Sequence, residues 1–402
     1  MYSKARLMKN IAVFTGTRAE YGILFPLLKA IKAHSELNLQ LMVSGMHLSP
    51  EFGHSVADII NDGFVVDEKI EMLLSSNTPV GCAKSVGLGI IGFADSLQRL
   101  APDVLVVLGD RFEALAVVQT AMLLNIPIAH IHGGEITQGA KDDAIRHAIT
   151  KLSTIHFTAN QAYRHRVIQL GESPNTVYCV GSLGLENITK HSTFFSKAEL
   201  KTQLSFDLGE KYFLLTYHSA TLADEPPLAS FNAIISALDK YPHHQLIITY
   251  PNADDGGREI IKQIESLAAQ FPERILAIPT LGFLKYFSAV KYATAVIGNS
   301  SSGIIEVPAF NVPSINIGQR QAGRMSADSV IHCAAQQSDI EQALKLADEG
   351  QVKFSGNNPY ALTGDNNEPE LTTSERIVQV LAEGSFSTQK SFYDLAPFAN
   401  NR

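Results

Sequence analysis

The chain has 402 residues, 45% of them hydrophobic, and a formal net charge of -8. At about 100–200 residues per domain, this length predicts two domains, each able to bury a core without disulfides or structural metals. The acidic balance argues against a general nucleic-acid-binding protein, because such proteins usually carry a basic surface. It still allows a local cluster of arginines around one anionic metabolite.

The three cysteines, Cys82, Cys179 and Cys333, are widely spaced and form no CxxC motif. This usage is typical of a reducing compartment. We expect no apolar run of the ~18 residues that a membrane-spanning helix needs. The sequence therefore predicts a cytoplasmic protein that has neither a membrane nor a nucleic acid as its partner.

In the first half of the chain, short apolar runs alternate with segments of helical spacing. The predicted strands are residues 11–15, 39–43, 104–108, 127–131, 155–159 and 177–180. The predicted helices between them include residues 21–32, 80–99 and 111–124. Residues 104–108 read Val-Leu-Val-Val-Leu, and such continuous apolarity is typical of a parallel strand that helices cover on both faces.

The alternation starts again after a polar stretch at about residues 187–211. Its predicted strands are residues 212–216, 245–250, 274–278, 294–297 and 313–317, and a last helix is predicted at 372–381. We therefore predict an α/β fold of two Rossmann-like, doubly wound domains with the active site in the interdomain cleft. The predicted division is 1–187, 188–371 and 372–402, where the last segment is a helix and tail that could cross back to the first domain.

Charged residues follow the predicted strands of the first half, where open α/β sheets bind ligands. Arg18 follows the first strand in the glycine-bearing turn GTRAEYG, and arginine makes bidentate contacts to phosphate. Asp110 follows the strand 104–108, where a helix cap is the alternative role. His130 and His132 end the strand 127–131, in which alternate residues point to the same face.

The segment after this strand adds more acids. Asp142 lies four residues before Arg146, and Asp143 four before His147, so each pair shares a helical face. Capping and surface ion pairs are one explanation, but acids and imidazoles that converge on one cleft suit proton transfer. The same side chains bind Zn, Mn or Fe, but because no recognised ligand spacing is present we predict no metal.

In the second half, residues 298–306 read GNSSSGIIE and follow a predicted strand at the start of a predicted helix. Hydroxyls and backbone N–H groups at such a position favour a diphosphate through the helix dipole. A serine-rich cap with a capping-box glutamate is the alternative. Arg320 could balance the phosphates, and His218 and Asn252 follow strands toward the same cleft.

Taken together, these motifs resemble the hydrolysing UDP-N-acetylglucosamine 2-epimerases of bacterial sialic- and legionaminic-acid pathways. The matching segments are GTRAEYG (16–22), LGDRFE (108–113), HIHGGE (130–135), DDAIRHAITKLS (142–153), GNSSSGIIEVPAF (298–310) and INIGQRQAGR (315–324). The resemblance implies a glycosyltransferase-B-like fold whose second domain binds most of the nucleotide. It also implies a nucleotide-sugar substrate, no cofactor, and a homodimer or homotetramer.

The resemblance also implies roles for single residues. Those that would hold the nucleotide are Ser300, Ser301, Arg320 and Arg18 for the diphosphate, Glu306 for the ribose and Phe283 for the base. Those that would line the sugar cleft are His218 and Asn252. Those that match the acid/base carboxylates are Asp110 and Asp142, with Arg111 and Arg146 close to them.

His132 is a departure from the family pattern, because related enzymes often carry Glu at this position. Either His132 performs the second proton transfer, or Glu135 reaches the sugar instead. We favour His132, since it is expected to share a strand face with His130.

The implied reaction converts UDP-N-acetylglucosamine into N-acetylmannosamine and UDP, by elimination to a glycal and then hydration. The same reaction on UDP- or GDP-N,N'-diacetylbacillosamine is an alternative, since the residues that contact C4 and C6 of the sugar cannot be placed from the sequence. A glycosyltransferase of the same architecture, or a nucleotide-sugar sensor, is an alternative of another class.

Overall fold

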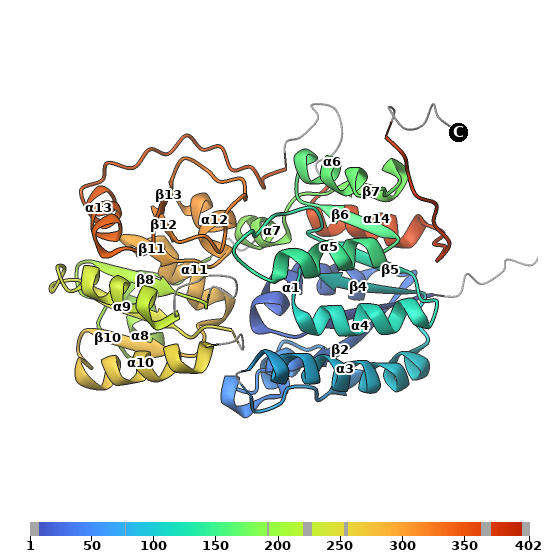
Figure 1. Cartoon of the computed structure of the whole chain (residues 1–402), viewed down its shortest axis with the longest axis horizontal. Coiled ribbons are helices and arrows are strands. Elements are labelled where there is room, and N and C mark those ends of the chain that lie inside the picture. Colours follow the sequence, from blue (N-terminus) through green and yellow to red (C-terminus); the bar gives the residue numbers. More distant parts are fainter. Residues whose placement is uncertain are drawn as a thin grey trace, which may run out of the picture.

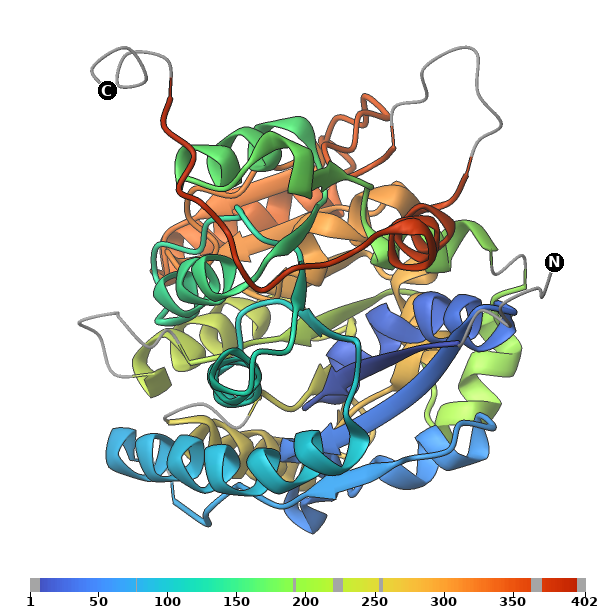
Figure 2. The same ribbon diagram turned by 90° about the vertical axis from the view of Figure 1, so that its right-hand side faces the viewer.

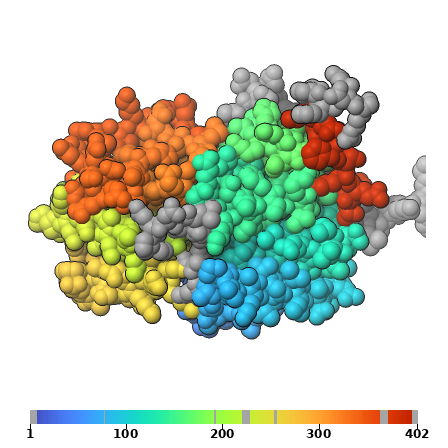
Figure 3. Space-filling view, in the orientation of Figure 1, coloured from blue at the N-terminus to red at the C-terminus, as the bar shows by residue number. Residues whose placement is uncertain are grey.

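The computed structural model describes residues 8–76, 78–190, 193–219, 227–252, 256–362 and 371–395. Within these residues, the strands form two parallel sheets flanked by helices, and the two sets of elements lie side by side (Figure 1). They abut along the middle of the molecule (Figure 3). The predicted α/β class with two doubly wound sheets is therefore confirmed.

The first sheet has the strand order β3-β2-β1-β4-β5-β6-β7. Its strands are β1 (Lys9–Thr15), β2 (Leu37–Ser44), β3 (Glu68–Ile70), β4 (Val104–Leu108), β5 (Ile128–Ile131), β6 (Ile155–Thr158) and β7 (Val177–Cys179). Its helices are α1 (Arg18–Ala33), α2 (Val56–Asn61), α3 (Pro79–Leu100), α4 (Phe112–Leu123), α5 (Asp142–Leu152), α6 (Gln161–Gln169) and α7 (Leu183–Lys190), with 3₁₀ turns η1 (Gly45–Leu48), η2 (Pro50–Phe52) and η3 (Pro174–Thr176).

Alternation along the strands of this sheet divides its core into two layers. Ile11 and Val13 of β1 pack with α1, whereas Ala12 and Phe14 pack with α3 and α4. This is the period of two that a strand covered on both faces requires.

The second sheet has the order β10-β9-β8-β11-β12-β13. Its strands are β8 (Tyr212–Thr216), β9 (Gln245–Thr249), β10 (Ile275–Ile278), β11 (Ala295–Gly298), β12 (Ser314–Ile317) and β13 (Val330–Cys333). Its helices are α8 (Lys197–Leu204), α9 (Pro227–Leu238), α10 (Gly257–Gln270), α11 (Gly282–Tyr292), α12 (Ser302–Ile305) and α13 (Gln337–Asp348), with the 3₁₀ turn η4 (Val307–Phe310). In both sheets the strand order reverses next to the first strand, as in dinucleotide-binding folds.

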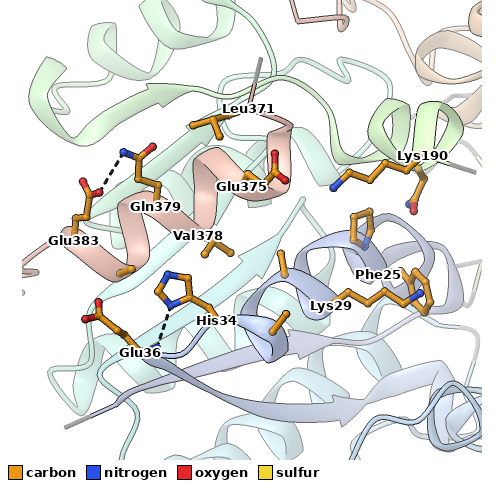
Figure 4. A pocket seen from close by; sticks show the side chains of 15 residues that line it. Phe25, Lys29, His34, Glu36, Lys190, Leu371, Glu375, Val378, Gln379 and Glu383 are labelled. Atoms are coloured by element: carbon orange, nitrogen blue, oxygen red, sulfur yellow. Dashed lines mark hydrogen bonds between the residues drawn. The ribbon is translucent and has the colours of Figure 1, made fainter. Parts of the chain in front are cut away.

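The last helix, α14 (Thr373–Glu383), returns to the first sheet after the second is complete (Figure 2). Its Ile377 and Leu381 lie in the same buried cluster as Leu24 and Leu28 of α1. An open groove of about 850 Å³ runs between the outer edges of these helices (Figure 4). The division at 187/188 stays a prediction, and α7 spans it.

Helix α3 corrects the expectation about apolar runs. It has 22 residues with a mean hydropathy of 1.3 over its best window, so by length and composition alone it could span a membrane. A third of that window is buried inside the protein, where α3 packs on α4 and β3. A helix that covers the sheet of a globular domain passes the same test.

Candidate functional site

A cavity of about 320 Å³ lies where the carboxyl ends of the two sheets face each other. Residues that follow β1, β4 and β5 line one side, and residues that follow β8, β9 and β11 line the other. The predicted site residues all lie along its wall: Arg18, Asp110, Arg111, His132, Glu135, Asp142, Arg146, His218, Asn252, Phe283, Ser300, Ser301, Glu306 and Arg320. Their roles stay predictions.

The turn after β1 is held by a capping box at the start of α1. Thr17 accepts a hydrogen bond from the N–H of Glu20, and Glu20 Oε2 accepts from the N–H groups of Gly16 at 2.7 Å and Thr17 at 3.1 Å. Burial, followed by the charge of Glu113, raises the pKa of Glu20 to about 8. Arg18 is anchored beside the turn by Asp58 at 3.1 Å.

Asp110, directly after β4 and its Gly109, pairs with the buried guanidinium of Arg146 on α5. Arg146 also donates to Thr137 Oγ1 at 3.1 Å and to the carbonyl of Glu135 at 3.0 Å. Burial opposes ionisation of Asp110, but Arg146, Arg324 and Arg320 together lower its pKa below the ordinary value. Asp110 is therefore an ionised carboxylate, as a base must be.

Asp142 and Arg146 lie four residues apart on α5, as do Asp143 and His147, so each pair shares a helical face as predicted, and His147 lies 3.6 Å from Asp143. Arg146 lies 3.5 Å from Asp143 as well. Asp142 Oδ2 lies 3.2 Å from Arg320, which belongs to the second sheet. Arg320 also donates to the carbonyl of Asn299 at 3.1 Å. One guanidinium therefore joins Asp142, in the first half of the chain, to residues 299–302 of the second half, which we call the serine loop.

The predicted shared strand face of His130 and His132 is wrong. Strand β5 ends at Ile131, and His132 has a left-handed backbone with φ of 66°. The ring of His130 bonds instead to the carbonyl of Gly109 at 2.7 Å and to Thr150. Burial lowers the pKa of His130 to about 3, so it is a neutral, structural side chain.

His132 makes its contact three residues later, where its Nδ1 lies 2.5 Å from Glu135 Oε1. The other oxygen of Glu135 lies 2.8 Å from the guanidinium of Arg324. Although burial opposes it, Arg324 and His132 lower the pKa of Glu135 to about 2. Sequence reasoning missed Arg324, although it is the last residue of the INIGQRQAGR motif and could have been found there.

On the opposite wall, Ser300 and Ser301 follow β11 as predicted, but the helix they begin is short. Helix α12 has 4 residues and passes directly into η4. So short a helix adds little dipole. The predicted binding of phosphate at this loop would therefore depend on its hydroxyls, its backbone N–H groups and Arg320.

Glu306 follows α12 and is buried against α7. Its Oε1 would lie 2.2 Å from a Cβ atom at Gly184, so only glycine leaves room for this carboxyl group. Burial raises the pKa of Glu306 to about 7, while a hydrogen bond from Ser302 opposes the shift. Gly184, in the first half of the chain, therefore makes room for Glu306, the residue predicted to bind ribose.

His218 is fixed by the side-chain amide of Asn299. This amide accepts from the N–H of His218 at 2.7 Å and donates to its carbonyl at 2.8 Å. His218 Nδ1 accepts the backbone N–H of Asn252 at 3.1 Å, so a neutral His218 carries its proton on Nε2. Phe283 packs edge-on against Phe287, with ring centroids 4.9 Å apart, and forms an aromatic wall.

Two doubly wound sheets that meet at one cavity define a two-domain α/β enzyme of glycosyltransferase-B-like architecture. The chain belongs to the UDP-N-acetylglucosamine 2-epimerase family, whose pattern it matches over residues 29–382.

Relatives in this family carry specific names. The chain is 37% identical to the GDP/UDP-N,N'-diacetylbacillosamine 2-epimerase (hydrolyzing) of Campylobacter jejuni, over 86% of this chain and 89% of that protein. It is 34% identical to the polysialic acid biosynthesis protein P7 of Escherichia coli, over 96% and 98%. It is 32% identical to a UDP-N-acetylglucosamine 2-epimerase of Neisseria meningitidis, over 96% and 100%.

Solved structures share the fold at lower identity. The UDP-GlcNAc 2-epimerase from Neisseria meningitidis bound to UDP-GlcNAc has a TM-score of 0.73 at 18% identity, over 94% of this chain and 100% of that one. The enzyme from Methanocaldococcus jannaschii in complex with UDP-GlcNAc and UDP also has a TM-score of 0.73 at 18% identity, over 93% and 100%. At this identity the likeness concerns the fold.

Proposed function

We propose that the protein hydrolyses a UDP- or GDP-linked 2-acetamido sugar with inversion at C2, by elimination to a glycal and then hydration. The observation that carries this proposal is the shared wall of the cavity. Ionised Asp110 stands on one side, the serine loop with Arg320 on the other, and the Arg320–Asp142 pair joins them.

Residues that follow the strands of the second sheet stabilise the leaving group. The C2 hydrogen of the sugar is only weakly acidic, because no carbonyl group is conjugated to it, so cleavage of the C1–O bond must run ahead of its removal. Ser300, Ser301 and Arg320, with Arg18 from the first sheet, stabilise charge that builds on the diphosphate. Arg320 can exchange Asp142 for a phosphate oxygen, since both are anionic.

The proton transfers are the task of the first sheet. Asp110 takes the C2 proton as the C1–O bond breaks, which leaves the glycal and the free nucleotide. Water then adds at C1, and a second group delivers a proton to the opposite face of C2. Asp142 and His132, which also line the cavity, are the candidates for this second group.

Two sugars are candidates. UDP-N-acetylglucosamine would give N-acetylmannosamine, and N,N'-diacetylbacillosamine linked to UDP or GDP would give its C2 epimer. The name of the Campylobacter jejuni relative favours the second, and that of the Neisseria meningitidis relative favours the first. Either product would enter the synthesis of a sialic or legionaminic acid in the cytoplasm. The enzyme would act as a homodimer or homotetramer and would use no metal or cofactor.

The test is NMR of the products formed from each nucleotide sugar in deuterated water. We expect free nucleotide and a C2-inverted sugar that carries deuterium at C2, because the new proton comes from the solvent. A glycosyltransferase would release little nucleotide until an acceptor is added, and a sensor would bind without turnover. Either result would overturn the proposal.

A further inference from the structure

The two nitrogens of His132 have different surroundings. Nδ1 is held by Glu135 at 2.5 Å, whereas Nε2 is buried and has no hydrogen-bond partner among the described residues. The side chain lines the cavity with a tenth of its surface exposed. Because a buried polar atom without a partner is costly, Nε2 is the atom of this ring that a ligand would satisfy.

The direction of the Nδ1 contact follows from charge. Glu135 is held ionised by Arg324 at 2.8 Å, and Arg146 donates to the carbonyl of the same residue. An ionised carboxylate can only accept, so Nδ1 must donate. The carboxyl of Glu306, from the second sheet, also interacts with the ring, and burial raises the pKa of this carboxyl to about 7.

The backbone conformation at His132 is unusual and makes the contact between Nδ1 and Glu135 possible. A left-handed φ of 66° is uncommon for a residue with a side chain, and it turns His132 out of the line of β5. Such conformations persist where the surrounding structure requires them. Here the turn brings Nδ1 onto Glu135, three residues along the chain.

We propose that His132 is the acid that delivers a proton to C2 through Nε2, and that Glu135 and Arg324 are positioning residues that hold its ring. This inference rests on the proposed function and decides between His132 and Glu135 within it. Nδ1 keeps its proton throughout, in its hydrogen bond to Glu135. Glu135 therefore does not transfer a proton to the sugar. Its two oxygens are already committed, one to His132 and one to Arg324.

The proton balance is as follows. In the elimination, the C2–H electrons form the C1–C2 double bond, Asp110 takes the proton, and the C1–O electrons leave with the nucleotide. In the hydration, the double-bond electrons take the proton from Nε2 of the imidazolium, and the water oxygen bonds to C1. The proton lost by that water re-protonates His132 through the solvent, and Asp110 returns its own proton to the solvent.

The decisive variant is Glu135→Gln, which keeps the shape of the side chain and removes its charge. We expect kcat for formation of the epimer to fall about 10²-fold with KM within about threefold, because Glu135 acts on the proton transfer to C2. The basic limb of the kcat–pH profile should move to lower pH, because a neutral amide stabilises the imidazolium less than a carboxylate does. UDP should still be released, accompanied by glycal instead of the epimer.

Glu172→Gln is the matched control. Glu172 is also buried and also contacts a histidine ring, His156, at 3.1 Å, but it lies outside the cavity. We expect the pH profile and product of Glu172→Gln to match wild type. An equal shift in both variants, or no shift in Glu135→Gln, would overturn the inference.

A second measurement does not depend on turnover. With ¹⁵N-labelled histidine and His132→Asn for assignment, NMR gives the pKa and the tautomer of His132 directly. Asparagine suits this position because it tolerates a left-handed backbone. We expect the neutral ring of the wild type to carry its proton on Nδ1. A neutral ring protonated on Nε2 would refute the positioning role of Glu135, whether or not the wild type turns over a sugar. A wild type that turns over no sugar but has its ring protonated on Nδ1 would refute the proposed function and leave the positioning role standing.

Discussion

Substitution of Asp110 should lower the rate of the reaction without changing the affinity for the nucleotide. Its carboxylate is paired with Arg146, and it stands on the first-sheet side of the cavity, away from the serine loop. Asp110→Asn should lower kcat by about 10²–10⁴-fold, because a positioned base is lost. The affinity for UDP, measured by calorimetry, should stay within about threefold. Near-normal turnover would exclude Asp110 as the base.

Gly184 is a residue that only the structure brings to attention. A methyl group at this position would meet Glu306 Oε1 at 2.2 Å, so Gly184→Ala should displace the carboxyl proposed to bind ribose. We expect about tenfold weaker UDP binding, or ~1.4 kcal/mol. Gly87→Ala is the matched control, since a Cβ there meets nothing within 4 Å, and its UDP affinity should not change.

At this scale, sequence reasoning placed the site residues but not their partners. Asp110 was placed by its position after a buried strand, and Asp142 and Arg320 by the motifs that carry the family resemblance, and all three line one cavity. The pairing of Asp142 with Arg320 joins residues 178 apart in the chain, which no local spacing reveals. His132 was misjudged for a related reason, since a strand pattern does not show that the backbone turns left-handed at its last step.

Among the elements, the start of α1 should make stability depend on pH. Glu20 has a pKa of about 8 in the folded protein against an ordinary 4.5, so the folded state keeps a proton that the unfolded state has lost. This contribution to stability is fully present below about pH 4.5 and is lost as pH rises towards about 8. Glu20→Gln cannot lose a proton, and glutamine still serves a capping box.

We therefore expect urea unfolding to show that Glu20→Gln gains stability relative to wild type between about pH 5 and pH 8. Glu375→Gln, at the exposed glutamate of the capping box of α14, should show no such gain, because the pKa of Glu375 is lowered by its backbone and side-chain bonds to Thr372. A difference that stays constant with pH would contradict the assignment.

The short α12 makes a second prediction at this scale. Since so short a helix has a weak dipole, its hydroxyls and Arg320 must supply most of the affinity for phosphate. The double variant Ser301→Ala, Arg320→Ala should weaken UDP binding at least about tenfold, because hydrogen bonds to a charged ligand are lost. Unchanged affinity would remove this loop from the phosphate site.

Most elements were predictable from apolar patterning, and the misses have a common cause. Strands β4 and β8 begin and end where the sequence predicts, because each is a continuous apolar run buried on both faces. The two missed strands, β3 and β13, lie at edges of their sheets, are short and contain charged or polar residues, as Glu-Lys-Ile and Val-Ile-His-Cys, whereas the edge strands β7 and β10 were predicted. An edge strand is covered by fewer neighbours, so it needs less of the apolar pattern that marks a central one.

For the whole molecule, recognition of the diphosphate by arginines should appear as salt dependence. The chain has a net charge of -8, and five arginines line the cavity, Arg18, Arg111, Arg146, Arg320 and Arg324, together with five carboxyl groups, Glu20, Asp110, Glu135, Asp142 and Glu306. Raising NaCl from about 0.05 M to about 0.5 M shortens the Debye length to a few ångströms. UDP should then bind several-fold more weakly, while uridine, which lacks the phosphates, should be unaffected. Equal responses of the two ligands would contradict phosphate recognition by these arginines.

The return of α14 to α1 means that the half of the molecule built on the first sheet is not one uninterrupted piece of the polypeptide. A fragment that stops at residue 190 lacks Ile377 and Leu381, and therefore leaves bare the apolar side of α1 that these two side chains cover. Lys9 would also lose its carbonyl partners at the end of α14, among them Ala382 at 2.7 Å. Splitting the gene at the obvious midpoint should thus yield an insoluble amino-terminal product, and a synthetic peptide of residues 371–395, supplied in trans, should rescue it.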